Sequence, residues 1–325
     1  MMNKAIIHIV ACLDHGFVMP TGVMMYSVCV NNPNVDINFH LIVDESVTED
    51  DQNDITETIA RFGDKRVVFY HISSRNCLAF PICNNENNLR ITQATYYRLF
   101  LTDILPETLD KVLYLDGDCI CRHSLLPLWE TDISNYAVGA VFDVSEGKIE
   151  YYNRLKYPFE LGYFNAGVLL VNLDYWRKQN VLKLFADFIA YHSERMRWED
   201  QDVMNFVFQD KKLYVPAKYN FQSGFLYKRA QWDYWKYENE LKEAKADPVI
   251  VHFSTSEKPW FTYTRHPHPF SSTFYKYQNQ TKWRGIRLEK RSIKQRLRNS
   301  IAKCLRKNGF ISPLKSRYID ILPID

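Results

Sequence analysis

Strand-like and helix-like segments alternate through the first 120 residues, and this alternation constrains the fold more than any other feature. The strand-like segments are short, almost continuously apolar runs: "AIIHIVACL" (5–13), "INFHLIV" (37–43), "KRVVFYHI" (65–72) and "KVLYLDGDCI" (111–120). Strands that are apolar on both sides are typical of parallel sheets covered by helices on both faces. The sequence therefore predicts an α/β fold in which ligands bind beyond the carboxyl ends of the strands.

Helix-start signals support the segments between these strands. Thr48 precedes an acidic first turn in "SVTEDDQNDITETIARFG" (46–63), and Gly63 lies at its end, so we expect a capped helix. Thr92 is the candidate cap of another helix, "TQATYYRLFLTDIL" (92–105). Further on, strand-like and helix-like runs follow in a less regular order, which favours a mixed, mainly parallel sheet. Neither an internal repeat nor a Gly/Ser-rich linker divides residues 1–281, and we expect them to form one domain.

The C-terminal residues 282–325 differ from this domain in charge. Residues 282–307 carry eleven Lys or Arg and one acid, a net charge of +10, which leaves −7 for residues 1–281 because residues 308–325 are neutral overall. Four apolar residues recur at every fourth position of this basic stretch: Ile293, Leu297, Ile301 and Leu305. Such a pattern predicts an amphipathic helix that attaches to an anionic membrane surface. Nucleic acid is the less favoured partner, since Trp283 is the one aromatic residue in the stretch.

Cysteine usage and hydropathy bear on the compartment. The seven cysteines form neither a CxxC pair nor a disulfide framework, which favours reduced thiols in the cytoplasm. We recognise no secretory cleavage signal and no apolar run near the roughly 20 residues of a membrane span. The expected location is cytoplasmic, with peripheral association at the inner face of the cell membrane.

The end of the fourth strand carries two carboxylates, Asp116 and Asp118, separated by Gly117. Two neighbouring carboxylates repel each other unless a cation lies between them, and a divalent ion bound to phosphate oxygens would satisfy this requirement. Gly117 would allow a ligand, such as a donor sugar, to approach the backbone closely. A solvated Asp-Gly turn is the structural alternative, and the local pattern alone leaves both interpretations open.

Five segments in order, however, resemble one enzyme family. They are "TYYRLFLTDIL", "DKVLYLDGDCI", "YFNAGVLLVNLDYWR", "WEDQDVMNFVF" and "VIVHFSTSEKPW", within residues 6–262. They are similar to motifs of the family 8 retaining glycosyltransferases, which use nucleotide sugars and include enzymes of bacterial lipopolysaccharide synthesis. The resemblance implies a single Rossmann-like domain of the GT-A type.

The resemblance also implies a metal site. In the family, the two carboxylates of the DxD motif and a later histidine hold Mn²⁺, and these positions correspond to Asp116, Asp118 and His252. Such a mixed carboxylate and imidazole set suits Mn²⁺ better than Mg²⁺, although Mg²⁺ is possible. Lys258 matches the family's phosphate-binding lysine. Without the resemblance, His252 would be interpreted as a buried structural histidine and Lys258 as a surface lysine.

The remaining implied roles concern the sugar donor and acceptor. The resemblance assigns donor contacts to Asp14, Arg98, Asp116, Asn165, Ala166, Gly167 and Lys258, catalytic positions to Asp200 and Gln201, and an acceptor-side position to Asp143. A strand-edge turn is the structural alternative for Asn165, and an acidic first helix turn is the alternative for Asp200 and Asp202. His15 and Gly16 depart from polar residues of some relatives, which puts the ribose contacts in question.

The function implied is transfer of glucose or galactose from a UDP-sugar to a hydroxyl of a glycolipid or lipopolysaccharide-type acceptor, giving an α-linkage. The sequence does not decide between the two sugars, and it leaves the acceptor and the oligomeric state open. Two alternatives remain: a non-catalytic UDP-sugar-binding protein and a self-glucosylating enzyme similar to glycogenin.

Overall fold

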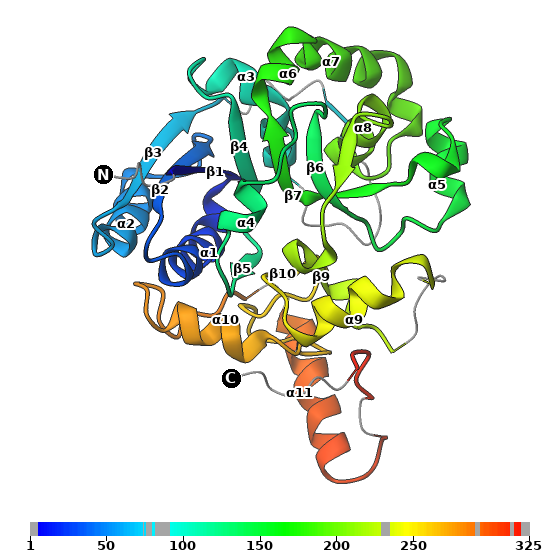
Figure 1. Cartoon of the computed structure of the whole chain (residues 1–325). Coiled ribbons are helices and arrows are strands. Elements are labelled where there is room, and N and C mark those ends of the chain that lie inside the picture. Colours follow the sequence, from blue (N-terminus) through cyan, green and yellow to red (C-terminus); the bar gives the residue numbers. More distant parts are fainter. Residues whose placement is uncertain are drawn as a thin grey trace.

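A seven-stranded sheet with the order β3-β2-β1-β4-β7-β6-β8 forms the centre of the molecule (Figure 1). The computed structural model describes residues 6–73, 75, 80–81, 92–228, 235–289, 293–312 and 315–319. The strands of this sheet are β1 (Ile6–Leu13), β2 (Asp36–Val43), β3 (Lys65–His71), β4 (Lys111–Leu115), β6 (Val138–Phe142), β7 (Phe164–Asn172) and β8 (Lys212–Tyr214).

The sheet is mixed and mainly parallel, as predicted. β1 pairs in parallel with β2 and β4, β2 with β3, and β6 with β8. β7 is the exception, since it runs antiparallel to both of its neighbours, β4 and β6. A second, three-stranded sheet has the order β5-β10-β9, formed by β5 (Cys119–Cys121), β10 (Ile250–His252) and β9 (Phe221–Gln222).

Helices cover the main sheet and extend its two apolar cores. Side chains of β4 alternate between these cores: Leu113 and Leu115 belong to one, and Val112 and Tyr114 to the other. This alternation is the period of two expected of a strand that is buried on both faces.

The α-helices are α1 (Val18–Asn31), α2 (Glu49–Ala60), α3 (Leu101–Ile104), α4 (Leu126–Trp129), α5 (Ile149–Leu155), α6 (Leu173–Lys178), α7 (Val181–His192), α8 (Glu199–Val207), α9 (Glu238–Ala246), α10 (Ser271–Gln278) and α11 (Ile293–Lys307). The 3₁₀ helices are η1 (His15–Phe17), η3 (Gln93–Phe100), η4 (Phe159–Leu161), η5 (Ser193–Arg195), η6 (Ala217–Tyr219), η7 (Ser223–Leu226) and η8 (Trp235–Tyr237).

The two predicted helix caps have different outcomes. Thr48 caps α2 in a capping box: its Oγ1 accepts from the Asp51 N–H at 3.1 Å, and Asp51 Oδ2 accepts from the Thr48 N–H at 3.0 Å. Thr92 does occupy the N-cap position before η3, as predicted, but its hydroxyl donates to Asp14 Oδ2 at 2.9 Å and makes no capping hydrogen bond.

The segment after Thr92 is also not one α-helix, but η3 followed by the short α3. A 3₁₀ helix has three residues per turn, so it places Thr95 and Arg98 on the same side. Both of these side chains reach Asp200 on α8. The tertiary contacts therefore decide the local helix type.

The chain beyond residue 281 packs against the domain on both sides of α11. The ring of Trp283 is seated on Gly22, where a Cβ would lie only 2.1 Å from it. Leu288 bridges to Phe261, and Tyr318, 1% exposed, pairs with Tyr227 in an antiparallel bridge. The division at residue 281 remains a prediction, but removal of residues 282–325 would also remove these core side chains.

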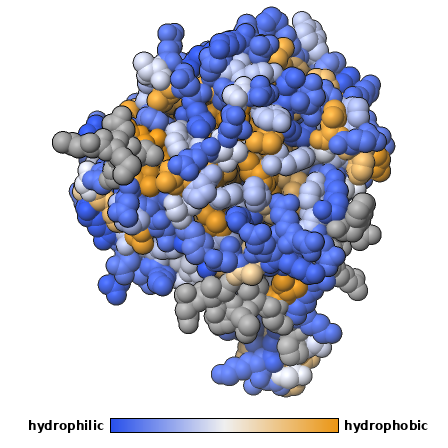
Figure 2. Space-filling view, viewed as in Figure 1, coloured by the Kyte–Doolittle hydropathy of each residue, from blue (hydrophilic) through white to orange (hydrophobic). Residues whose placement is uncertain are grey.

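Between these anchored segments, α11 projects from the bottom of the molecule as drawn (Figure 1). Leu297 and Ile301 are each 59% exposed, and Leu305 is also exposed. The side chain of Ile293 lies outside the described residues, as do residues 290–292. Figure 2 shows that the visible part of this projection is mainly hydrophilic. No helix among the described residues combines the length and the apolarity needed to cross a membrane.

Candidate active site

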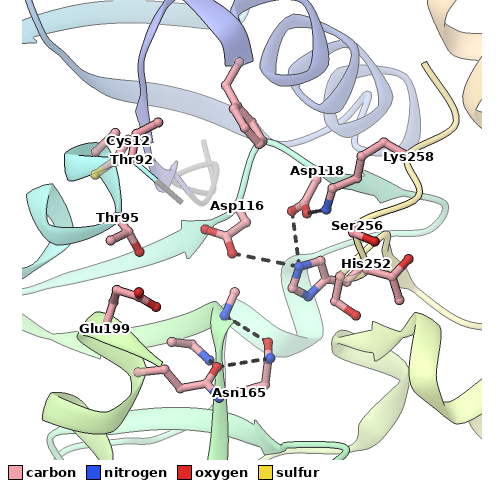
Figure 3. A pocket seen from close by; sticks show the side chains of 18 of the residues that line it. Cys12, Thr92, Thr95, Asp116, Asp118, Asn165, Glu199, His252, Ser256 and Lys258 are labelled. Atoms are coloured by element: carbon pink, nitrogen blue, oxygen red, sulfur yellow. Dashed lines mark hydrogen bonds and ion pairs between the residues drawn. The ribbon is translucent and has the colours of Figure 1, made fainter. Parts of the chain in front are cut away.

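A cavity of about 720 Å³ opens at the carboxyl ends of β1 and β4 (Figure 3). Its volume lies within the range of sites for small organic ligands. All twelve residues that the sequence predicts for the site line this cavity: Asp14, Arg98, Asp116, Asp118, Asp143, Asn165, Ala166, Gly167, Asp200, Gln201, His252 and Lys258. The fold therefore brings together residues that are separated by up to 244 positions in the chain.

The antiparallel direction of β7 explains why two distant motifs meet here. Because β7 runs opposite to β4, its first residues lie beside the last residues of β4, with Leu115 opposite Val168. The Asp116 N–H then donates to the Gly167 carbonyl at 2.8 Å. On the other side of the turn between β4 and β5 (116–118), β5 pairs with β10 so that Cys119 lies opposite His252. The β4–β5 turn thus sits between the β7 motif and the histidine.

Carboxylate oxygens of two converging side chains lie near the imidazole of a third. His252 Nε2 lies 3.2 Å from Asp118 Oδ1 and 3.9 Å from Asp116 Oδ2. Asp118 Oδ1 is buried and has no hydrogen-bond donor. An acceptor atom that is buried without a donor is costly unless a cation approaches it. Carboxylate oxygens with one imidazole nitrogen are a suitable ligand set for a divalent transition metal, so the residues fit the implied ion.

Cys119 lies close to this group. One ligand atom each of Asp118, Cys119 and His252 lies within 4.8 Å of the others. Burial raises the pKa of the Cys119 thiol well above its ordinary value. A metal binds the thiolate rather than the thiol. Asp116, the third ligand predicted from the sequence, is not a member of this group, although its Oδ2 lies 3.9 Å from His252 Nε2. Its role as a ligand therefore stays a prediction.

Two basic residues balance the carboxylates from outside. Lys258 Nζ lies 2.5 Å from Asp118 Oδ2 and 2.5 Å from the Phe253 carbonyl. Burial alone would raise the pKa of Asp118, but the positive charge of Lys258 and the neighbouring His252 lower it well below its usual range. Asp118 is therefore ionised, with one oxygen on Lys258 and the other directed toward His252.

Arg98 pairs with Asp116 in the way that Lys258 pairs with Asp118. Its guanidinium contacts Asp116 Oδ1 at 2.8 Å and Asp200 Oδ2 at 3.2 Å, and it donates to the Ala166 carbonyl at 2.7 Å. Burial opposes the charge on Arg98, yet Asp116 and Asp200 raise its pKa well above the ordinary value. Burial also raises the pKa of Asp200 to about 6, against the opposite effect of Arg98. Arg98 thus joins η3, the β4–β5 turn and α8.

An amide network holds the β7 side of the cavity. Gln201 Oε1 accepts from the Ala166 N–H at 3.0 Å and from Asn165 Nδ2 at 3.2 Å. Gln201 Nε2 donates to Asp143 Oδ2 and to the Tyr163 hydroxyl. Asn165 Nδ2 also donates to Asp143 Oδ2, at 2.9 Å. The side-chain oxygen and nitrogen of Gln201 each have two hydrogen-bond partners, and these four contacts fix the orientation of the amide.

The two glycines of the site also have packing roles that the sequence does not indicate. A Cβ on Gly117 would meet Thr21 Oγ1 at 2.3 Å, so this glycine allows the turn to pack on α1. The approach of a donor sugar to Gly117 stays a prediction. A Cβ on Gly167 would lie 2.3 Å from His252 Cε1 and 2.8 Å from Asp116 Oδ2. Gly167 is therefore the glycine that leaves space for the convergence of carboxylate and imidazole.

Asp202 is structural, as its sequence alternative suggested. It is fully buried and accepts a bidentate pair from Arg154, at 2.7 and 3.0 Å. It also accepts from the N–H groups of Arg197 and Trp198 at the start of α8. These contacts tie α5 to the start of α8 and so orient Asp200 and Gln201.

Sequence reasoning missed several residues of the site. The Tyr114 hydroxyl donates to Asp116 Oδ1 at 2.9 Å, and Thr95 donates to Asp200 Oδ1 at 2.5 Å. Asn220 contacts His252 Nδ1 at 2.9 Å from a segment without any motif. Glu199, which precedes the predicted pair, has a left-handed backbone with φ of 37° and is buried at the cavity. A single non-glycine residue at positive φ costs about 1–3 kcal/mol and is typical of functional sites.

Comparison with known proteins agrees with this geometry. Residues 8–264 match the model of glycosyl transferase family 8. The chain is 27% identical over 290 residues to general stress protein A of Bacillus subtilis, covering 88% of this chain and 98% of that protein. It is 28% identical over 278 residues to lipopolysaccharide 1,3-galactosyltransferase of Salmonella typhimurium, covering 83% and 77%. The solved structure of galactosyltransferase LgtC in complex with donor and acceptor sugar analogues has the same fold, with a TM-score of 0.75 at 24% identity over 89% of this chain and 99% of that one.

The close approach at Gly167 leads to a testable prediction. The substitution Gly167→Ala should displace His252 or Asp116 and lower the affinity for Mn²⁺ at least about tenfold, as losses of ligand orientation do. Titration followed by the EPR signal of free Mn²⁺ measures this affinity. Gly63→Ala is the matched control, since a Cβ at Gly63 meets nothing within 4 Å. Equal Mn²⁺ affinity of the two variants would contradict the geometric role of Gly167.

Proposed function

The chain belongs to glycosyl transferase family 8, and from this premise we propose that it transfers glucose or galactose from a UDP-sugar to a hydroxyl of a saccharide acceptor, with retention of the α configuration. The observation that carries the proposal is that oxygens of Asp118 and Asp116 lie 3.2 and 3.9 Å from His252 Nε2 in the cavity. Buried acceptors that face one another are suited to an ion that binds the diphosphate of a nucleotide sugar.

Asp116, Asp118 and His252 would hold Mn²⁺, with Mg²⁺ as the alternative. The bound ion would supply positive charge to the diphosphate, which stabilises charge that develops as UDP leaves. Lys258 and Arg98 add fixed positive charge on either side of the carboxylates. Charged groups that are held in place before the reaction stabilise the transition state without reorganisation.

The nucleotide itself would bind along the edge of the cavity near β1. Asp14 lines this edge, and the bond from Thr92 fixes its carboxylate. The residue after it, His15, is engaged elsewhere, with Nδ1 2.8 Å from Asp51 Oδ2. We therefore assign the base contact to Asp14 and no contact to the side chain of His15.

The residues beneath the sugar favour a single displacement. In a double displacement, a free carboxylate would attack the anomeric carbon. Asp200 Oδ1 accepts from Thr95, and Oδ2, which has no hydrogen bond, forms an ion pair with the guanidinium of Arg98 at 3.2 Å that lowers its nucleophilicity. Gln201 is an amide whose oxygen already accepts two hydrogen bonds. Neither side chain is a good nucleophile in this arrangement.

We therefore assign the chemistry to attack from the face that UDP leaves. The bond between the anomeric carbon and the phosphate oxygen breaks, and the acceptor oxygen bonds to the same face of the carbon. The departing phosphate oxygen takes the proton of the acceptor hydroxyl. Gln201 and Asp143, fixed by their mutual bonds, would orient the donor sugar and the acceptor side of the cavity.

The acceptor class follows from the relatives and from the tail. One relative is named a lipopolysaccharide 1,3-galactosyltransferase, and another is the lipopolysaccharide glucosyltransferase WaaO of Escherichia coli. A glycolipid or lipopolysaccharide-type acceptor would lie at the inner face of the cell membrane. The exposed residues Leu297, Ile301 and Leu305 of α11, flanked by basic residues, would attach the enzyme to that surface.

Catalysis can be separated from mere binding by UDP release. With UDP-glucose or UDP-galactose and Mn²⁺, the wild type should release UDP, and Asp118→Asn should lose at least about 100-fold, because charge stabilisation by a held metal ion is worth several kcal/mol. Asp174→Asn, an exposed carboxylate paired with Lys178, is the matched control and should keep full activity. Absence of metal-dependent release from any UDP-sugar would leave only the UDP-sugar-binding alternative.

Membrane attachment is best tested by substitution within α11, since truncation would also remove Trp283 and Tyr318. The double substitution Leu297→Glu with Ile301→Glu should weaken binding to anionic vesicles at least about tenfold, because burial of each apolar side chain is worth about 1.5–3 kcal/mol. Co-sedimentation with phosphatidylglycerol vesicles measures the binding. Leu184→Glu, at an exposed leucine of α7, is the control and should bind normally. Unchanged binding of the α11 variant would refute attachment through this helix.

A further inference from the structure

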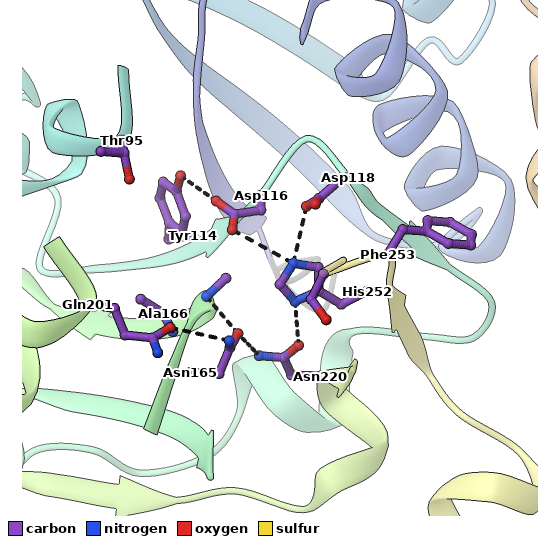
Figure 4. Close-up of polar contacts among 12 residues, drawn as sticks. Thr95, Tyr114, Asp116, Asp118, Asn165, Ala166, Gln201, Asn220, His252 and Phe253 are labelled. Atoms are coloured by element: carbon purple, nitrogen blue, oxygen red, sulfur yellow. Dashed lines mark hydrogen bonds and ion pairs between the residues drawn. The ribbon is translucent and has the colours of Figure 1, made fainter. Parts of the chain in front are cut away.

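We propose that Asn220 is a positioning residue that sets the tautomer of His252, so that the Nε2 lone pair faces the two carboxylates. Asn220 Oδ1 lies 2.9 Å from His252 Nδ1, on the side of the ring opposite to Asp118 (Figure 4). This inference rests on the proposed metal site and adds to it a residue outside the motifs of the sequence. A histidine ligand depends on the group that holds its second nitrogen.

The orientation of the Asn165 side-chain amide is fixed by two partners, one of which can only donate a hydrogen bond and one of which, when ionised, can only accept one. The Gly167 N–H is only a donor, and it contacts the side chain of Asn165 at 3.0 Å, so this contact must be Oδ1. Asp143 is an acceptor when ionised, and it contacts the other end of Asn165 at 2.9 Å, which must be Nδ2. Two independent partners thus fix the orientation of the Asn165 amide.

The orientation of Asn165 in turn determines that of Asn220. Asn220 approaches Asn165 Oδ1 at 2.8 Å and must present Nδ2 to it. Its Oδ1 then faces His252 Nδ1, which must carry the proton to make a hydrogen bond. In the neutral imidazole, Nε2 is therefore the unprotonated nitrogen. The backbone N–H of Gly167 and the carboxylate of Asp143 thus determine which atom carries the proton in each hydrogen bond from Asn165 to His252.

Burial makes this arrangement strict. Asn220 is fully buried, and His252 and Asn165 are 4% and 8% exposed. Water therefore cannot easily replace a lost partner. If His252 instead carried its proton on Nε2, Nδ1 and Asn220 Oδ1 would face each other as two acceptors. An unsatisfied buried polar group costs about 1–3 kcal/mol.

The same network connects the metal site with the sugar side of the cavity. Asn165 lies between Asn220 and Gln201 (Figure 4). It also donates to Asp143. Asp143, expected only to line the acceptor side, thus has a second role as an anchor of the network. A displacement of the donor sugar against Gln201 would reach His252 through two amide groups.

The tautomer can be measured in the presence of saturating Mg²⁺, a diamagnetic ion that would separate the Nε2 lone pair from Asp118 Oδ1, 3.2 Å away. ¹⁵N-histidine NMR distinguishes the two neutral tautomers by the nitrogen shifts, at a pH where the imidazole is neutral. The signal of His252, one of nine histidines, is assigned by its loss in His252→Gln. The wild type should show the proton on Nδ1. A wild-type spectrum with the proton on Nε2 would overturn the proposal, whether or not the protein has transferase activity.

Variants of Asn220 test whether this residue sets the tautomer of His252. Asn220→Ala should lose the tautomer preference and weaken Mn²⁺ binding about 10- to 100-fold. Asn220→Asp keeps an acceptor for Nδ1 and should keep the tautomer, but it replaces the donor to Asn165 Oδ1 by an acceptor and should lower the stability. Asn32→Ala, which removes another buried amide far along the chain, is the matched control for loss of stability. An Asn220→Ala protein with the wild-type tautomer and Mn²⁺ affinity would refute the role of Asn220. A correct tautomer in a wild type that binds no Mn²⁺ would instead refute the proposed metal site and leave the tautomer assignment standing.

Discussion

The placement of two carboxylates, Asp116 and Asp118, around His252 is the constraint on which the rest of this site depends. Two carboxylates at one turn of a buried strand end need positive charge on several sides. Lys258 and Arg98 supply it from the outside, each through one carboxylate oxygen. The second oxygens face His252, which completes a set of electron-pair donors. A cation bound between them would satisfy Asp118 Oδ1, which has no hydrogen bond, and this supports the proposed metal-dependent transfer.

The topology makes this concentration of charge possible. A reversal of direction at β7 brings "FNAG" to the carboxyl end of β4, and the small β5-β10-β9 sheet brings His252 to the other side of the turn. Gly167 leaves the space in which imidazole and carboxylate meet. The side-chain amides of Asn165 and Asn220 then hold His252, and their own orientation is fixed by the Gly167 N–H, which can only donate a hydrogen bond. Such preorganisation lets the chain place charges before substrate binds.

Residues whose role follows from a local pattern were predictable, and those that act through tertiary contacts were not. Asp116 and Asp118 were placed by the apolar strand before them, and Thr48 by the capping pattern, whereas His252 and Lys258 required the family resemblance. Thr92 carries the same cap signal as Thr48, but its hydroxyl bonds to Asp14, a contact that only the folded chain creates. Asn220 has no sequence signal, because its function depends on the orientation of Asn165, 55 positions away. The basic tail was predicted as a helix, while its anchoring by Trp283 and Tyr318 depends on packing that no periodicity encodes.

The proposed coordination of a divalent ion by Asp116, Asp118 and His252 can be tested most directly by pulsed EPR of the Mn²⁺ complex with UDP. One imidazole nitrogen should couple to the Mn²⁺ electron spin, and the coupling should disappear in His252→Gln while phosphorus couplings from UDP remain. Absence of a nitrogen coupling in the wild type, or its persistence in His252→Gln, would show that Mn²⁺ binds elsewhere and would contradict the metal site derived from the structure.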